Sequence, residues 1–94
     1  MYTVETHHHC KDWRNGDLED KLELIGSKNF KTRKSAKEYI ESNLKGHKNV
    51  FRNYHKGNER SWCGYYTGET WVHENTGSKM AEYYQYTMFK TKVN

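Results

Sequence analysis

Residues 30–44 (FKTRKSAKEYIESNL) are the only long stretch of this chain in which apolar residues recur with the period of an α-helix. Thr32 or Ser35 can cap the start of this helix, and Ser35 with Glu38 has the spacing of a capping box. Gly46 follows the last apolar position, where helices commonly end in a residue with a positive φ. The helix carries one apolar stripe, which consists of Ala36, Tyr39, Ile40 and Leu44. The rest of the chain is predicted as strands and turns, which must bury this stripe.

Two strands are predicted before the helix. Apolar and polar residues alternate over residues 2–7, which indicates a half-buried strand with Tyr2 and Val4 inward. Asn15-Gly16 is a strong hairpin signal. It predicts a turn into a second strand over residues 20–25.

Four strands are predicted after the helix, over residues 50–55, 60–67, 70–74 and 80–93. Residues 80–85 could instead be helical, but their Tyr and Thr content favours a pleated sheet. The sequence therefore predicts a single domain over residues 1–94 with an α+β fold. One helix packs on a mostly antiparallel sheet, in the order β-β-α-β-β-β-β.

The composition limits where such a chain can reside. No run of 18 apolar residues is present, so we predict no membrane partner. The first residues lack a basic segment followed by an apolar one, so we expect no signal peptide and a cytoplasmic protein. In that compartment Cys10 and Cys63 are expected to be free thiols.

The net charge of +4 is unevenly distributed, with −3 over residues 1–27, +7 over residues 28–60 and 0 over residues 61–94. Cations crowd the start of the predicted helix, where the macrodipole already disfavours them by roughly 0.3–1 kcal/mol each at exposed sites. A helix N-terminus with free N–H groups and surplus cations suits anions. We predict that this block contacts phosphates or an acidic protein surface. The alternative is a solvated face that keeps the protein soluble. The predicted binding residues are Lys31, Arg33, Lys34, Lys37, Arg52, Lys56 and Arg60.

Ten of the fourteen aromatic residues lie after residue 50. Neighbouring residues in a strand point to opposite faces, so adjacent tyrosines place rings on both faces of the sheet. One face of the sheet packs against the helix. The rings on the other face can stack on nucleic-acid bases, bind another protein or a second copy of the chain, or simply belong to the hydrophobic core. The predicted aromatic face consists of Tyr65, Tyr66 and Trp71.

The run from His7 through His9 to Cys10 has the residue types of a metal site. Cys63 with His55 or His73 could complete a tetrahedral zinc set, and a Cys10–Cys63 disulfide or a Cys–His nucleophile pair are further alternatives. The close ligand pairs usual in structural zinc sites are missing, so we predict no metal and no cofactor.

Catalytic motifs are also missing, and no catalytic residue is predicted. The nearest approach to a site for a divalent metal is an acidic set in and after the predicted turn. Acidic residues are common in such turns, so the prediction is a protein that is not an enzyme. The set consists of Asp12, Asp17, Glu19 and Asp20.

In its size, its lack of proline, its Lys-, Asn- and Tyr-rich composition and its lack of catalytic motifs, the whole chain resembles small bacteriophage accessory proteins that counter host defence, anti-CRISPR proteins among them. The resemblance implies a non-enzymatic protein that docks on a host nucleic-acid-handling enzyme in the bacterial cytoplasm and inhibits it. The basic helix and aromatic sheet are the surfaces expected to dock. Two alternatives remain open, a direct RNA- or DNA-binding protein and a small metal-dependent nuclease or hydrolase.

Overall fold

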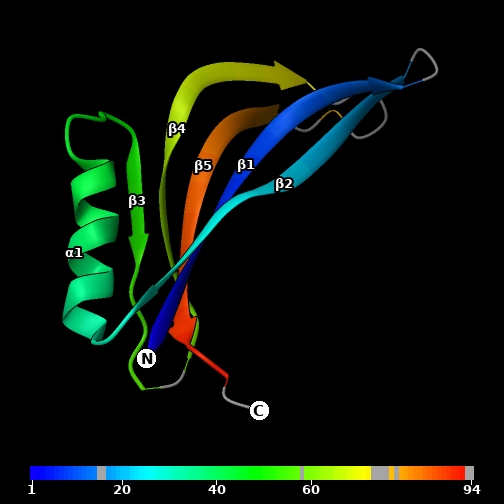
Figure 1. Cartoon of the computed structure of the whole chain (residues 1–94). Coiled ribbons are helices and arrows are strands. Elements are labelled where there is room, and N and C mark those ends of the chain that lie inside the picture. The colour runs from blue at the N-terminus through cyan, green and yellow to red at the C-terminus, as the bar shows by residue number, and fades with distance from the viewer. Residues whose placement is uncertain (15–16, 58, 73–76, 78, 93–94) are drawn as a thin grey trace.

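The protein is an α+β fold in which one helix covers one face of a five-stranded antiparallel sheet (Figure 1). The computed structural model describes residues 1–14, 17–57, 59–72, 77 and 79–92, and it describes side chains at all of these except 11–14, 17–20, 68–69, 71 and 79–80. The elements in chain order are β1 (Tyr2–Arg14), β2 (Asp17–Phe30), α1 (Arg33–Leu44), β3 (Val50–Asn53), β4 (Ser61–Val72) and β5 (Lys79–Lys90).

The strand order across the sheet is β2-β1-β5-β4-β3. Strands β1 and β2 pair with each other, as do β4 and β5, and the two pairs join where β1 lies against β5. Helix α1 follows β2, the strand at one edge of the sheet, and precedes β3, the strand at the other edge. It therefore carries the chain across one face of the sheet, beside β3 (Figure 1).

The sequence prediction of six strands was wrong, because the structure has five. The sequence predicts two strands over residues 60–67 and 70–74, separated at Gly68, but β4 is continuous from Ser61 to Val72. Residues 73–74 lie outside the described part of the chain. Its register with β5 shifts between Tyr66 and Thr70, so a bulge absorbs the extra residues without ending the strand. The prediction of strand over helix for the last element is confirmed by β5.

The remaining strand boundaries also differ from the prediction. Strand β3 ends at Asn53 instead of residue 55, and β2 is longer than residues 20–25 at both ends. The hairpin predicted at Asn15-Gly16 lies outside the described residues, although the strands beside it pair Arg14 with Asp17. Polar residues pair as readily as apolar ones in a backbone ladder, so alternation underestimates strand length.

The helix forms where its apolar period predicts it. Thr32 is the N-cap residue, and its hydroxyl accepts a hydrogen bond from the Ser35 backbone N–H at 3.1 Å. Ser35 therefore lies inside the first turn and does not begin a capping box with Glu38. At the other end, Gly46 has a φ of 89°, as predicted for a residue just past the helix.

The core lies between α1 and the sheet. Helix residues Ala36, Ile40 and Leu44 are almost fully buried, as the predicted stripe requires. The sheet contributes buried Val4, Cys63, Tyr86 and Met88, and half-buried rings surround them, including Tyr2, Phe30, Tyr39, Tyr54 and Tyr65. With so few aliphatic residues, the core depends on aromatic rings that bury large areas. With 12 residues and a mostly polar exposed surface, α1 is unable to cross a membrane, and the described residues contain no other helix.

Strand register separates the two faces of the sheet. Val4, Met88 and Ser61 are aligned across three strands on the face toward the helix. The residues between them in each strand point to the opposite face, which α1 does not cover. On that opposite face Thr3, His9 and Thr87 are nevertheless buried.

Candidate functional site

The start of α1 carries cations and no acidic residue in its first turn. Lys31 and Lys34 are exposed there. Arg33 behaves differently, because its guanidinium donates a hydrogen bond to the backbone carbonyl of His55. That bond brings the loop after β3, with exposed Lys56, against the helix start. The structure thus gathers Lys31, Lys34 and Lys56 around one end of the helix and uses Arg33 to hold the loop there.

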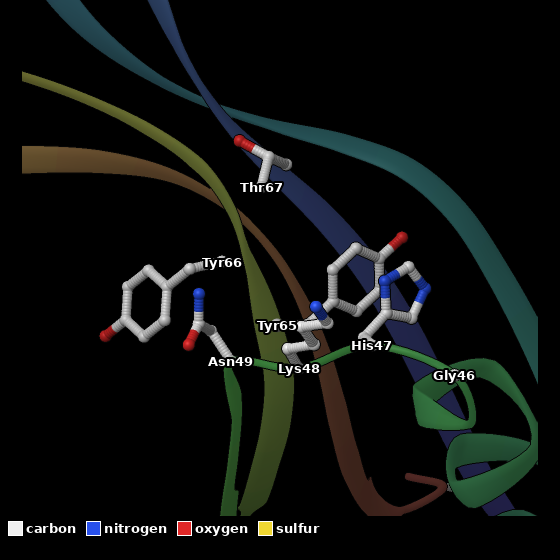
Figure 2. A pocket seen from close by; sticks show the side chains of 7 residues that line it. All are labelled: Gly46, His47, Lys48, Asn49, Tyr65, Tyr66 and Thr67. Carbon is white, nitrogen blue, oxygen red and sulfur yellow. The ribbon is translucent and has the colours of Figure 1, made fainter.

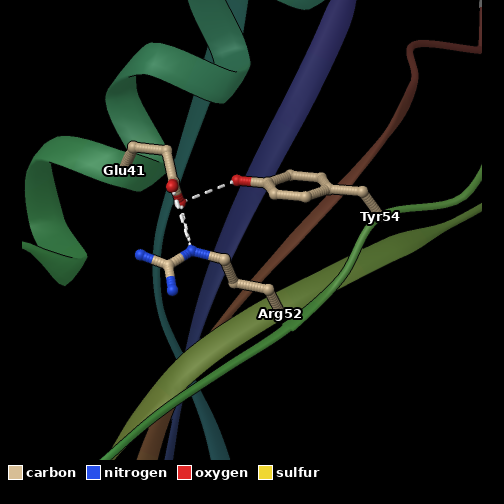
Figure 3. Close-up of polar contacts among 3 residues, drawn as sticks. All are labelled: Glu41, Arg52 and Tyr54. Carbon is tan, nitrogen blue, oxygen red and sulfur yellow. Dashed lines mark hydrogen bonds and ion pairs between the residues drawn. The ribbon is translucent and has the colours of Figure 1, made fainter. Parts of the chain in front are cut away.

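Two further predicted cations are engaged between α1 and β3. Glu41 accepts hydrogen bonds from Arg52 Nε at 2.9 and 3.1 Å and from the Tyr54 hydroxyl at 3.0 Å (Figure 3). Lys37 Nζ lies 4.6 Å from the centroid of the Tyr54 ring. These contacts anchor β3 to the helix, so Arg52 and Lys37 have structural partners within the chain.

The ionisation of this cluster follows from its contacts. The hydrogen bond and charge of Glu41 raise the pKa of Arg52, so its guanidinium stays charged. Burial raises the pKa of Tyr54, and its hydrogen bonds to Cys63 and Glu41 act in the same direction. Burial likewise raises the pKa of the Cys63 thiol. The Cys63 thiol is buried and its pKa is raised, and a thiol in such surroundings is a poor nucleophile.

Arg60 packs over an aromatic ring of the sheet. Its Cζ is 4.5 Å from the centroid of Phe89. Phe89 follows the buried Met88 in β5 and so points to the face away from the helix. The guanidinium of Arg60 therefore lies on the face of the sheet that α1 does not cover.

The predicted aromatic residues divide between the two faces. On the helix side, four rings stack across the sheet, with centroids 3.6 Å apart for His47 and Tyr65, 5.3 Å for Tyr65 and Tyr84, and 4.4 Å for Tyr84 and His8. This aromatic row begins just beyond the end of α1. Because each inner ring has neighbours on both of its faces, the row stiffens the sheet and leaves only its end rings free to stack on a ligand.

A second aromatic cluster lies on the opposite face. Tyr66 and Tyr83 meet edge to face at 5.9 Å, Phe51 lies 5.3 Å from Tyr66, and His9 stacks on Tyr83 at 4.7 Å. Tyr66 is 44% exposed, so one ring of this cluster is available to a partner. The side chain of Trp71, which was predicted with Tyr65 and Tyr66, lies outside the described residues.

A shallow pocket of about 410 Å³ lies where the loop after α1 meets β4. Figure 2 shows the His47 and Tyr65 rings face to face on one side of it, Asn49 with Tyr66 on the other, and Lys48 between them. The Tyr66 backbone N–H donates to the Asn49 carbonyl at 2.9 Å, which holds the loop against the strand. The pocket thus combines an ammonium group, an imidazole, an amide and an exposed aromatic ring.

Sequence reasoning missed this pocket. Its loop residues belong to the basic block and lie between the predicted helix end at Gly46 and the predicted strand over residues 50–55. The run His47-Lys48-Asn49 was the available signal, because three polar side chains able to bind a ligand follow a helix stop.

The histidine and cysteine run is divided by strand alternation. His8 joins the aromatic row, whereas the ring of His9 reaches the backbone carbonyl of Ala81 on the other face, with Nδ1 at 3.1 Å from the oxygen. Both cysteines are free thiols. Cys63 of β4 pairs with Tyr86 of β5, which pairs with Thr6 of β1, and Cys10 lies four residues further along β1. The two cysteines are therefore roughly 16 Å apart, which is too distant for a disulfide.

Within the described residues, no three His, Cys, Asp or Glu side chains gather closely enough to hold a metal ion. His73 and the side chains of Asp12, Asp17, Glu19 and Asp20 lie outside that description. The chain matches no protein-family model, no curated protein and no solved structure.

Proposed function

We propose that this is a non-enzymatic binding protein that docks on a nucleic-acid-handling enzyme of a bacterial host and inhibits it. The basic end of α1 is the docking surface, and Lys31, Lys34 and Lys56 are its exposed cations. The observation that carries the proposal is the first turn of α1, which exposes lysines and has no acidic residue. Stability of the helix alone would favour the opposite charge there.

The chemistry of the partner supports this choice. Enzymes that cut or copy nucleic acid commonly hold divalent metal ions in clusters of carboxylates. Such a cluster is an anionic target for ammonium groups presented on a rigid helix. Docking there would block access of the metal and the nucleic acid together, which explains how a protein without catalytic groups can inhibit.

Direct binding of single-stranded nucleic acid is the second candidate, and the pocket after α1 favours it. Lys48 can pair with a phosphate, Asn49 can bond a base edge, and the exposed ring of Tyr66 can stack on a base. Binding of this kind would weaken steeply as salt concentration rises.

A charge reversal tests the main proposal. Lys31→Glu combined with Lys34→Glu should leave the fold intact, because both side chains are exposed and acidic residues suit a helix start. The same change should reduce capture of a nucleic-acid-handling enzyme from nuclease-treated bacterial lysate by at least about tenfold. It should equally relieve inhibition of that enzyme after purification.

The matched control is Lys45→Glu with Lys48→Glu, which changes net charge equally at exposed positions just beyond the C-terminal end of α1, the opposite end of the helix from Lys31 and Lys34. This control should bind and inhibit as the parent protein does. Equal capture by both variants, or no inhibition by the parent protein, contradicts the main proposal. Anisotropy with a labelled oligonucleotide tests the second candidate, which requires that Lys48→Ala and Tyr66→Ala weaken binding.

A further inference from the structure

Strand β2 forms one edge of the sheet and pairs only with β1 among the described strands (Figure 1). It is 14 residues long. An edge strand of this length presents a row of backbone N–H and C=O groups that can pair with another strand. Natural proteins usually shorten, cover or charge such an edge, so its surface shows what it is built to meet.

The exposed surface of β2 is unusually apolar for this chain. The sequence contains only four Leu and two Ile. Three of these six residues lie together on β2 with more than half of their surface exposed: Leu22 at 54%, Leu24 at 55% and Ile25 at 53%. A protein whose core is short of aliphatic side chains gains nothing as a monomer by leaving half of its Leu and Ile in water.

Charged residues alternate with these leucines. Lys21 and Glu23 flank Leu22, and Lys21 Nζ lies 2.8 Å from Glu23 Oε1. Register with β1 places Leu22 opposite His9 and Leu24 opposite His7, and the ladder is irregular between Thr6 and His7. Ile25 is the extra residue at that irregularity, so the regular ladder of β2 is interrupted after Leu24 and resumes at Gly26.

We propose that two copies of the chain pair through β2, antiparallel, around a two-fold axis at Leu22. This register places Lys21 of each copy opposite the partner's Glu23 and the two Leu22 side chains opposite each other. Leu24 lies diagonally beside the partner's Leu22, so four leucines form one apolar cluster. Opposite charges and apolar pairs facing each other across strands are both favourable.

The neighbouring register is less favourable for two reasons. An axis at Glu23 would place the two Glu23 carboxylates opposite each other, and like charges in that position are destabilising. It would also place Ile25, the bulged residue, inside the paired segment. An axis at Leu22 avoids the contact between the two Glu23 carboxylates and keeps Ile25 outside the paired segment, which is confined to residues 20–24. The two five-stranded sheets then join into one sheet of ten strands.

The pairing leaves β3 uncovered at the other edge of the sheet, and α1 begins at Arg33, beyond the end of β2 and outside the paired residues 20–24. It is therefore independent of the proposed function. The dimer would present two basic helix ends and two pockets, one pair from each copy.

Sedimentation velocity across a concentration series tests the proposal through charge reversal. The parent protein should dimerise, and Lys21→Glu or Glu23→Lys alone should weaken the dimer by roughly tenfold or more, because each turns two symmetric attractive pairs into repulsive ones. The double variant restores opposite charges in both pairs and should recover the parent dissociation constant. Lys34→Glu makes the same charge change on α1 and should leave dimerisation unaltered.

Oxidative crosslinking tests the register without relying on charge. In a Cys10→Ser background Cys63 stays buried, so an added thiol on β2 is the reactive one. Leu22→Cys should crosslink across the axis, whereas Glu23→Cys should not. A parent protein that stays monomeric at high micromolar concentration, a double variant that does not recover, or crosslinking at position 23 instead of 22 overturns the proposal.

Discussion

Gly64 shows how one residue fixes the packing of the uncovered face. A Cβ atom at this position would collide with the Tyr84 carbonyl oxygen and lie 2.6 Å from Phe51 Cζ. The missing side chain is therefore what allows the Phe51 ring to lie over β4 and reach Tyr66 and Tyr83. Glycine weakens a strand interior, so its presence in β4 reflects this close approach.

Gly64→Ala should lower the free energy of unfolding by about 1–3 kcal/mol, because the added methyl group overpacks a site closed by backbone. Urea denaturation measures the change. Gly26→Ala is the matched control, since its Cβ would meet only Thr6 Cβ at an ordinary 3.9 Å. If both variants unfold at the same urea concentration, Phe51 does not pack over Gly64.

The helix illustrates how an element can be predicted locally and still depend on the sheet. Its cap at Thr32, its buried stripe and its end near Gly46 all follow from nearby residues. Its stability comes from the sheet, because a 12-residue helix is marginal in water on its own. Glu41 then connects it to β3 through Arg52 and Tyr54.

Ile40→Asp should unfold the domain at room temperature, because it places an unpaired carboxylate where the exposed fraction is zero. Circular dichroism and thermal melting measure the loss. Glu38→Asp introduces the same residue on the exposed side of α1 and should change stability little. A cooperative melt for Ile40→Asp at the parent temperature would show that the helix does not pack as described.

At the scale of the whole molecule, the core contains groups that ionise at high pH. Burial raises the pKa of Tyr86 to about 12 and also raises the pKa of Tyr54, Tyr65 and Cys63. Each of these acids loses its proton at lower pH in the unfolded chain than in the folded one. Their contribution to stability is therefore complete below the unfolded pKa and disappears as pH rises through the folded pKa.

The domain should accordingly lose stability from about pH 9, where an unfolded cysteine ionises, and more steeply from about pH 10 to 12 as the tyrosines follow. Urea midpoints across this range measure the loss. Cys63→Ala should remove the earliest part of the decline and keep the later part. Midpoints that stay constant up to pH 11 would show that these rings are not buried in the native state.

The sequence by itself determined the local features of this protein. The stripe from Ala36 to Leu44, the α+β class and the placement of Tyr65 and Tyr66 on opposite faces need only a 3.6-residue or two-residue period. The same reasoning located surplus cations at the helix start, where Lys31 and Lys34 are exposed.

Tertiary structure alone decided which of those features meet. Strand order joins β1 to β5 across about 80 residues of sequence, and this pairing stacks His8 on Tyr84 in one row with His47. Tertiary packing also engages Arg33 and Arg52 in internal contacts and places Arg60 over Phe89. Periodicity reports how a residue is oriented on its own element. Only long-range pairing and packing determine its neighbours, because that choice depends on the whole chain at once.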